Sequence, residues 1–106
     1  MAAFRAAYGR TPTLYASQGY DAARLIGSAL EAVEGDLSKE QAFREALQKA
    51  DFESVRGNFR FGSNNHPVQD IYVREVVRTA DGTFTNKTLE KVFSDHVDAY
   101  APECRM

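Results

Sequence analysis

The sequence of 106 residues contains a single cysteine, Cys104, and no long hydrophobic run. A lone cysteine cannot form a disulfide within the chain, so we expect a free thiol or half of a bridge whose partner lies elsewhere. No segment approaches the roughly 20 consecutive apolar residues that a membrane-spanning helix requires. The residues after Met1 also lack the basic region and apolar core of a secretory signal peptide.

Positive charge is also scarce, because 13 lysines and arginines stand against 15 acidic residues and the net charge is −2. This balance provides neither the basic surface that attracts nucleic acids nor a polybasic patch for anionic lipids. We therefore expect no nucleic-acid partner. Hydrophobic residues make up 43% of the chain, which is enough for a core, and the length fits one domain at most.

The residue patterns of catalytic and metal sites are missing as well. His66, His96 and Cys104 are the only soft metal ligands, and their spacing matches no zinc motif. The sequence has no G-x-S-x-G nucleophile elbow and no glycine-rich phosphate loop. We therefore expect no metal site, no cofactor and no enzymatic activity.

Residues 14–33 predict a long helix with a narrow polar stripe. At 3.6 residues per turn the polar side chains gather on one side, and nearly all other positions are apolar or small. Such a helix needs cover around most of its circumference. We expect it to be the buried element, with its polar stripe facing solvent. The stripe consists of Ser17, Asp21, Arg24, Ser28 and Glu31.

The rest of the chain predicts an α+β arrangement, with about three helices packed on a small antiparallel sheet of a short strand and a hairpin. Ser38 and Gln41 form a capping-box pattern, and residues 80–82, Ala-Asp-Gly, are typical of a hairpin turn. The central helix has more apolar surface than these elements can cover, so we expect part of a longer chain or a self-associating one. The expected helices are residues 2–8, 14–34 and 38–50, the expected strands are residues 58–61, 70–79 and 83–93, and an extended arm is expected over residues 94–106.

Two residues of the central helix are candidates for ligand contact. Tyr15 lies at the helix entry, on the side shared by Ile26 and Val33. Because ligand pockets favour aromatic side chains, a ligand contact and a core tyrosine are equally expected there. Gln18 falls on the apolar side, where a buried amide needs hydrogen-bond partners. For Gln18 the favoured interpretation is a hydrogen bond within the core.

Four motifs in a fixed order carry a family resemblance. They are an aromatic residue followed by G-Y-D-A in the central helix, then A-L-x-x-A-D-F, V-R-G-x-F-x-F and N-H-x-x-Q-D-x-Y-x-R-E-V-V. With the terminal P-E-C-R-M, they resemble the C-terminal portion of substrate-binding proteins of branched-chain amino acid ABC transporters. These are type I periplasmic binding proteins, also called extracellular ligand-binding receptors. The resemblance covers essentially the whole chain.

The resemblance implies a two-lobed α/β protein that closes on a small solute in the periplasm. Such a protein delivers the solute to an ABC permease of the inner membrane and catalyses nothing. A complete member is several times longer and carries a signal peptide, so residues 1–93 would be an incomplete part of one lobe. Most groups that fix the solute would lie in segments outside this chain. The resemblance assigns a ligand contact to Tyr15, and Gln18 is a weaker candidate.

Three functions remain open at this point. The resemblance favours a solute-binding protein for branched-chain amino acids or related small carboxylates, including aromatic ones. The first alternative is a ligand-sensing regulator on the same fold, in which the solute controls a partner protein. The second is a self-associating fragment, a homodimer that binds no solute of its own, which the wide apolar surface favours.

Overall fold

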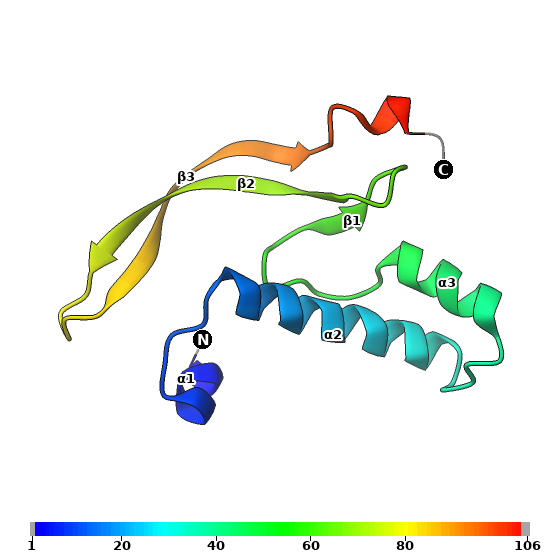
Figure 1. Ribbon diagram of the computed structural model, residues 1–106, viewed down its shortest axis with the longest axis horizontal. Coiled ribbons are helices and arrows are strands. Elements are labelled where there is room, and N and C mark those ends of the chain that lie inside the picture. Colours follow the sequence, from blue (N-terminus) through cyan, green and yellow to red (C-terminus); the bar gives the residue numbers. More distant parts are fainter. Residues whose placement is uncertain (1, 105–106) are drawn as a thin grey trace.

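The computed structural model describes residues 2–104 and has helices beside a small antiparallel sheet (Figure 1). The strands lie in the order β1-β2-β3, and each neighbouring pair is antiparallel. The expected α+β class is confirmed. The elements are α1 (Ala2–Tyr8), α2 (Leu14–Ala32), α3 (Glu40–Lys49), β1 (Phe59–Phe61), β2 (Pro67–Arg78), β3 (Phe84–His96) and the short 3-10 helix η1 (Ala101–Glu103).

Helix α3 begins two residues later than the sequence predicts, because Ser38 is engaged elsewhere. The backbone N–H of Ser38 and its hydroxyl both donate to Asp36 Oδ1, at 3.0 and 2.6 Å. This turn competes with the capping box for the same serine. Lys39 is the N-cap of α3 instead, and it makes no side-chain hydrogen bond to the helix. The predicted capping box is therefore wrong.

The expected extended arm is also wrong for its described part, because β3 continues to His96. Opposite Asp70 the pairing is irregular, and Asp95 on β3 has a φ of 50°. The Asp95 backbone N–H donates to Asp70 Oδ1 at 3.1 Å, and Lys91 Nζ lies 2.6 Å from Asp70 Oδ2. These contacts satisfy the backbone where a bulge interrupts the ladder, so the strand runs on. Residues 105–106 of that arm lie outside the described residues.

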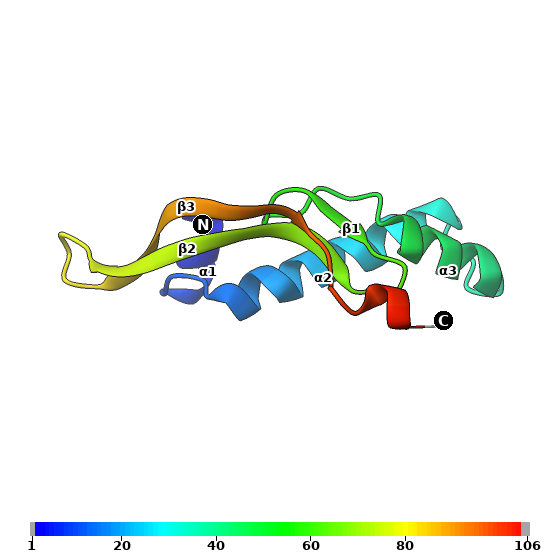
Figure 2. The same ribbon diagram turned by 90° about the horizontal axis from the view of Figure 1, so that it is seen from above.

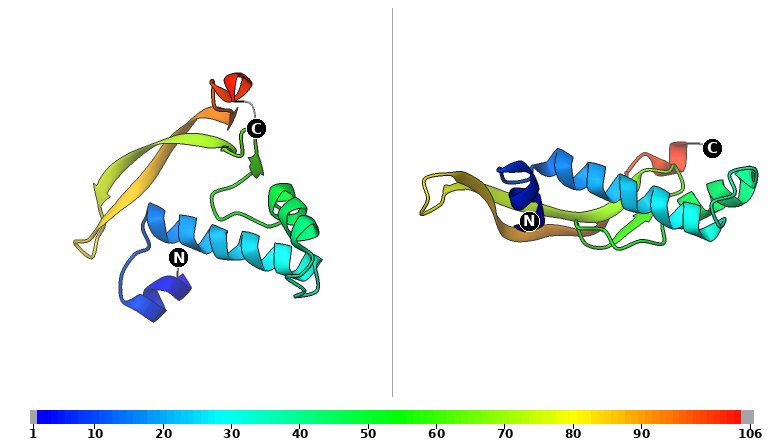
Figure 3. Two further views of the ribbon diagram at one scale, coloured as in Figure 1. Left: turned by 45° about the vertical axis from the view of Figure 1, so that its right-hand side comes forward. Right: turned by 90° about the horizontal axis from the view of Figure 1, so that it is seen from below.

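The segment after β3 folds back onto the turn between β1 and β2 (Figure 3). Asp98 accepts a hydrogen bond from Nδ2 of Asn64 at 2.8 Å, and its carboxylate lies 3.3 Å from Nδ1 of His66. Ala101 in η1 and Val68 in β2 are both buried. This tail is therefore ordered by a loop 34 residues earlier in the chain, a contact that local periodicity does not report.

The chain is flat and extended, with extents of 51 × 35 × 15 Å (Figure 2). Its radius of gyration is 16.9 Å, against about 13 Å for a compact domain of this length. Its accessible surface is 8208 Å², against about 5,900 Å² for a folded monomer of this mass. The chain therefore exposes roughly 2,300 Å² more surface than a compact domain would.

Part of this additional surface is the apolar side of α2. This helix packs against α3, and within the described residues its backbone does not closely approach any strand. Tyr15, Tyr20 and Ile26 are consequently exposed. The prediction of a buried central helix is wrong for this chain, because the other described elements leave its apolar side uncovered.

The turn between β2 and β3 is organised by one carboxylate. Gly82 has a φ of 83°, a value that glycine adopts without steric cost. Asp81 accepts hydrogen bonds from the hydroxyls of Thr79 and Thr83 and from the Thr83 backbone N–H. These hydrogen bonds lower the pKa of Asp81 to about 2, and the bond from Thr79 contributes most.

We expect this turn to lose stability in acid. Because folding lowers the pKa of Asp81, the carboxylate contributes fully above its ordinary pKa of 3.8, and the contribution is lost as the pH falls toward about 2. The hydrogen-exchange protection factor of the Thr83 amide should fall over this range. Asp81→Asn should hold it at the low value throughout. A protection factor that is independent of pH in the unmodified chain would contradict this account.

Candidate functional site

The two candidate ligand residues lie one turn apart near the start of α2. Tyr15 is 81% exposed, and Gln18 is exposed as well. The core interpretation of Tyr15 does not hold within this chain. For Gln18, the expected hydrogen bond within a core is also wrong, because its side chain is exposed and no element of residues 2–104 covers this side of the helix. Both side chains are open to an outside partner or ligand.

Tyr15 begins an uncovered apolar stripe along α2. Tyr15, Gly19, Ala22 and Ile26 follow one another at helical spacing, and all four are exposed. A Cβ placed on Gly19 would meet no atom within 4 Å. Among the described residues, no neighbouring backbone therefore approaches the helix closely at Gly19. We call these four residues the α2 stripe.

Asp21 is the first residue of α2 that is buried, although the sequence places it on the solvent-facing side. It is 2% exposed, so its prediction as a solvated side chain is wrong, whereas Arg24 is exposed. Its Oδ2 accepts hydrogen bonds from Ser54 Oγ at 2.6 Å and from Arg56 Nε at 2.8 Å. Its Oδ1 accepts one from the Val55 backbone N–H at 3.0 Å. We call these four residues, Asp21, Ser54, Val55 and Arg56, the Asp21 clasp.

The electrostatics of the clasp favour an ionised carboxylate. Burial alone would raise the pKa of Asp21, but the hydrogen bonds from Ser54, Arg56 and Val55 outweigh it and hold the pKa below its ordinary value. The side chain of Arg56, its ion-pair partner, is only 21% exposed. Charge-assisted hydrogen bonds are strongest where little water screens them, so the clasp is a firm attachment point.

Arg56 extends the clasp to the sheet. Its Nη1 lies 3.3 Å from Oε1 of Gln69 on β2. Its guanidinium carbon lies 5.5 Å from the ring centroid of Phe59 on β1, which is a cation–π distance. The Arg56 backbone N–H also donates to Ser54 Oγ at 3.0 Å. One arginine thus joins α2 to both β1 and β2.

An open groove of about 630 Å³ lies beside the clasp, along the loop after α3 and strand β1. Phe52, Phe59 and Arg60 are among its lining residues. Tyr15 and Gln18 do not line it. The groove and the predicted ligand residues are therefore separate surfaces of this chain.

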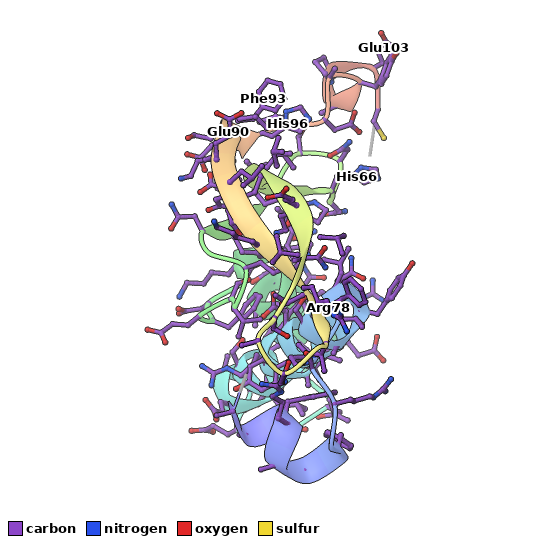
Figure 4. All side chains as sticks on the ribbon, turned by 90° about the vertical axis from the view of Figure 1, so that its left-hand side faces the viewer. His66, Arg78, Glu90, Phe93, His96 and Glu103 are labelled. Carbon is purple, nitrogen blue, oxygen red and sulfur yellow. The ribbon has the colours of Figure 1, made fainter. Side chains whose placement is uncertain are left out.

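The soft metal ligands of the sequence do not gather into a cluster within residues 2–104. His66 pairs with Asp98, and Cys104 is an exposed free thiol. Figure 4 shows His66 and His96 near the C-terminal turn, and the His96 ring lies 5.3 Å from that of Phe93. Within residues 2–104, no helix has both the length and the hydropathy needed to cross a membrane.

Comparison with known proteins identifies the family. Residues 1–83 match the family model of periplasmic binding proteins. The chain belongs to the periplasmic binding protein family. A solute-binding protein of an ABC transporter from R. palustris, solved in complex with benzoate, is 33% identical over 99% of this chain, with a TM-score of 0.81. An ABC transporter substrate-binding protein from Sphaerobacter thermophilus is 34% identical over 89% of it, with a TM-score of 0.79.

The chain spans 28% and 26% of the lengths of these two relatives. It therefore has the structure of one part of a periplasmic binding protein fold, which accounts for its flat shape and its uncovered helix. The sequence has no significant match among curated proteins. The expected preference for branched-chain amino acids gains no support from these relatives, since the R. palustris protein was solved with benzoate.

We expect Arg56→Ala to destabilise the chain by about 3 kcal/mol, because it leaves a buried carboxylate without its charged partner. Arg60→Ala is the matched control: this arginine is exposed and lies on β1, four residues further on. Its removal should change stability by less than about 0.5 kcal/mol. Urea unfolding followed by circular dichroism measures both. Equal losses for the two variants would show that the Asp21 clasp adds nothing to stability.

Proposed function

We propose that this chain is part of a periplasmic solute-binding protein that delivers a small carboxylate to an ABC permease of the inner membrane. The observation that carries the proposal is the likeness to the benzoate-bound R. palustris protein, which extends over 99% of this chain. It favours an aromatic carboxylate. A branched-chain amino acid, which the sequence motifs favour, is the competing solute.

Tyr15 and Gln18 are the residues through which this chain would contact the solute. The exposed phenol ring of Tyr15 can pack against an aromatic or branched apolar group. The side-chain amide of Gln18, one turn further on and also exposed, can donate a hydrogen bond to a carboxylate. An apolar face with a neighbouring polar group is the usual composition of a small-solute site.

A chimera tests the proposal. Residues 1–106 replace the corresponding 28% of the R. palustris protein, which restores a two-lobed protein around this chain. Isothermal titration calorimetry then compares benzoate with leucine. We expect benzoate to bind more tightly. Tighter binding of leucine would assign the branched-chain alternative, and a folded chimera that binds neither solute would overturn the proposal.

Tyr15→Ala in the chimera should weaken solute binding about tenfold, because the loss of an aromatic contact costs about 1.5 kcal/mol. Tyr20→Ala is the matched control. Tyr20 is an exposed tyrosine on the same helix, but it lies outside the α2 stripe. Tyr20→Ala should change the dissociation constant of the chimera for the solute by less than about twofold. Equal effects of the two substitutions would remove Tyr15 from the site.

The surface of the chain also supports self-association of the isolated 106 residues. The additional 2,300 Å² or so of exposed surface exceeds the roughly 1,600 Å² that a standard interface buries. Light scattering over a concentration series should show a dimer, and Ile26→Glu in the middle of the α2 stripe should return it to a monomer. Arg24→Glu, on another side of α2, is the control and should leave the dimer intact. A monomer at all concentrations would contradict this expectation.

A further inference from the structure

We propose that Asp21 is a positioning residue for the solute site. Its buried contacts with Ser54, Val55 and Arg56 fix the first two turns of α2 relative to β1 and β2. These turns carry Tyr15, which lies farther along the helix from Asp21 than Gln18 does, so Asp21 acts on the solute mainly through Tyr15. The inference rests on the proposed solute-binding function and adds to it a residue that does not touch the solute.

Packing contributes little to holding the start of α2 in place. Residues 14–20 are all exposed or half-buried, and Asp21 is the first buried residue of the helix. Helix α3 lies beside the C-terminal half of α2 (Figures 1 and 3). Within the described residues, the Asp21 clasp is the side-chain hydrogen-bonded link between α2 and the segment that leads into β1.

The distance along α2 amplifies any change of orientation at Asp21. Asp21 lies six positions after Tyr15, which is about 9 Å along a helix axis. If the helix tilted by about 10° around Asp21, Tyr15 would move by roughly 1.5 Å. A displacement of this size is enough to spoil a binding geometry that needs placement to about 0.5 Å. A small tilt of the helix at Asp21 therefore displaces Tyr15 far enough to weaken its contact with the solute.

The clasp fixes the orientation of α2 as well as its distance from residues 54–56. The two carboxylate oxygens of Asp21 accept from donors on three consecutive residues, so the side chain is held at both oxygens. An asparagine in its place would accept hydrogen bonds at one oxygen only. Its NH₂ group, itself a donor, would face one of the existing donors and could not accept from it. Asp21→Asn therefore loosens the orientation of the helix start while it keeps the size of the side chain.

A double-mutant cycle in the chimera tests the inference. Asp21→Asn should weaken benzoate binding by about five- to tenfold when measured well below the melting temperature. In the Tyr15→Ala background it should have little further effect, because the contact that it positions is already gone. Asp36→Asn is the matched control. Asp36 also accepts hydrogen bonds from a neighbouring serine, but it lies beyond the C-terminal end of α2, so this variant should bind benzoate as the unmodified chimera does.

Ser54→Ala provides a second, milder variant if Asp21→Asn does not fold. It removes one of the three donors and leaves the ion pair, so we expect a weakening of about threefold that also disappears in the Tyr15→Ala background. A general loss of stability would instead give effects that multiply with that of Tyr15→Ala, which would overturn the positioning role alone. Absence of benzoate and leucine binding by the unmodified, folded chimera would overturn the proposed function and the positioning role with it.

Discussion

The structure depends on one buried carboxylate. Asp21 is removed from water almost completely, and such a group is costly to bury unless donors replace the lost hydration. Three donors from consecutive residues do so, and one of them, Arg56, also contacts β1 and β2. Within residues 2–104 α2 lies against no strand, so this contact is what links the long helix directly to the sheet.

Elements with a local signal could be predicted from the sequence. The β2–β3 hairpin follows from alternating residues and from the Asp81-Gly82 turn, whose carboxylate and positive φ the structure shows directly. The end of β3 could not be predicted, because it depends on Asp70 reaching a backbone N–H 25 residues away. The start of α3 could not be predicted either, because Asp36 competes with the cap for Ser38 through an equally local hydrogen bond.

Burial of Asp21 could not be read from the helical pattern, because a narrow polar stripe looks the same whether it faces water or a loop. Ser17 and Ser28 on that stripe donate to carbonyls of their own helix, at 2.6 and 2.9 Å, so they do not require water. The sequence does carry one signal for this burial, the V-R-G motif after α3. Its Val55 backbone N–H and Arg56 side chain lie 34 and 35 residues after Asp21 and donate hydrogen bonds to it. Gln18 is the opposite case, because an apolar surface predicts that the side chain is covered but does not indicate whether this chain itself provides the cover.

The α2 stripe relates the completion of the fold to the proposed site. Tyr15 stands at the N-terminal end of the same exposed row as Gly19, Ala22 and Ile26. A further part of the protein, or a partner, that packs over this row would therefore end beside Tyr15. A solute in contact with Tyr15 would then lie at the edge of that covering part. The groove of this chain lies elsewhere, along β1. Enclosure of the solute would thus depend on the covering part, while the proposed role of the Asp21 clasp would be to set the angle at which Tyr15 meets the solute.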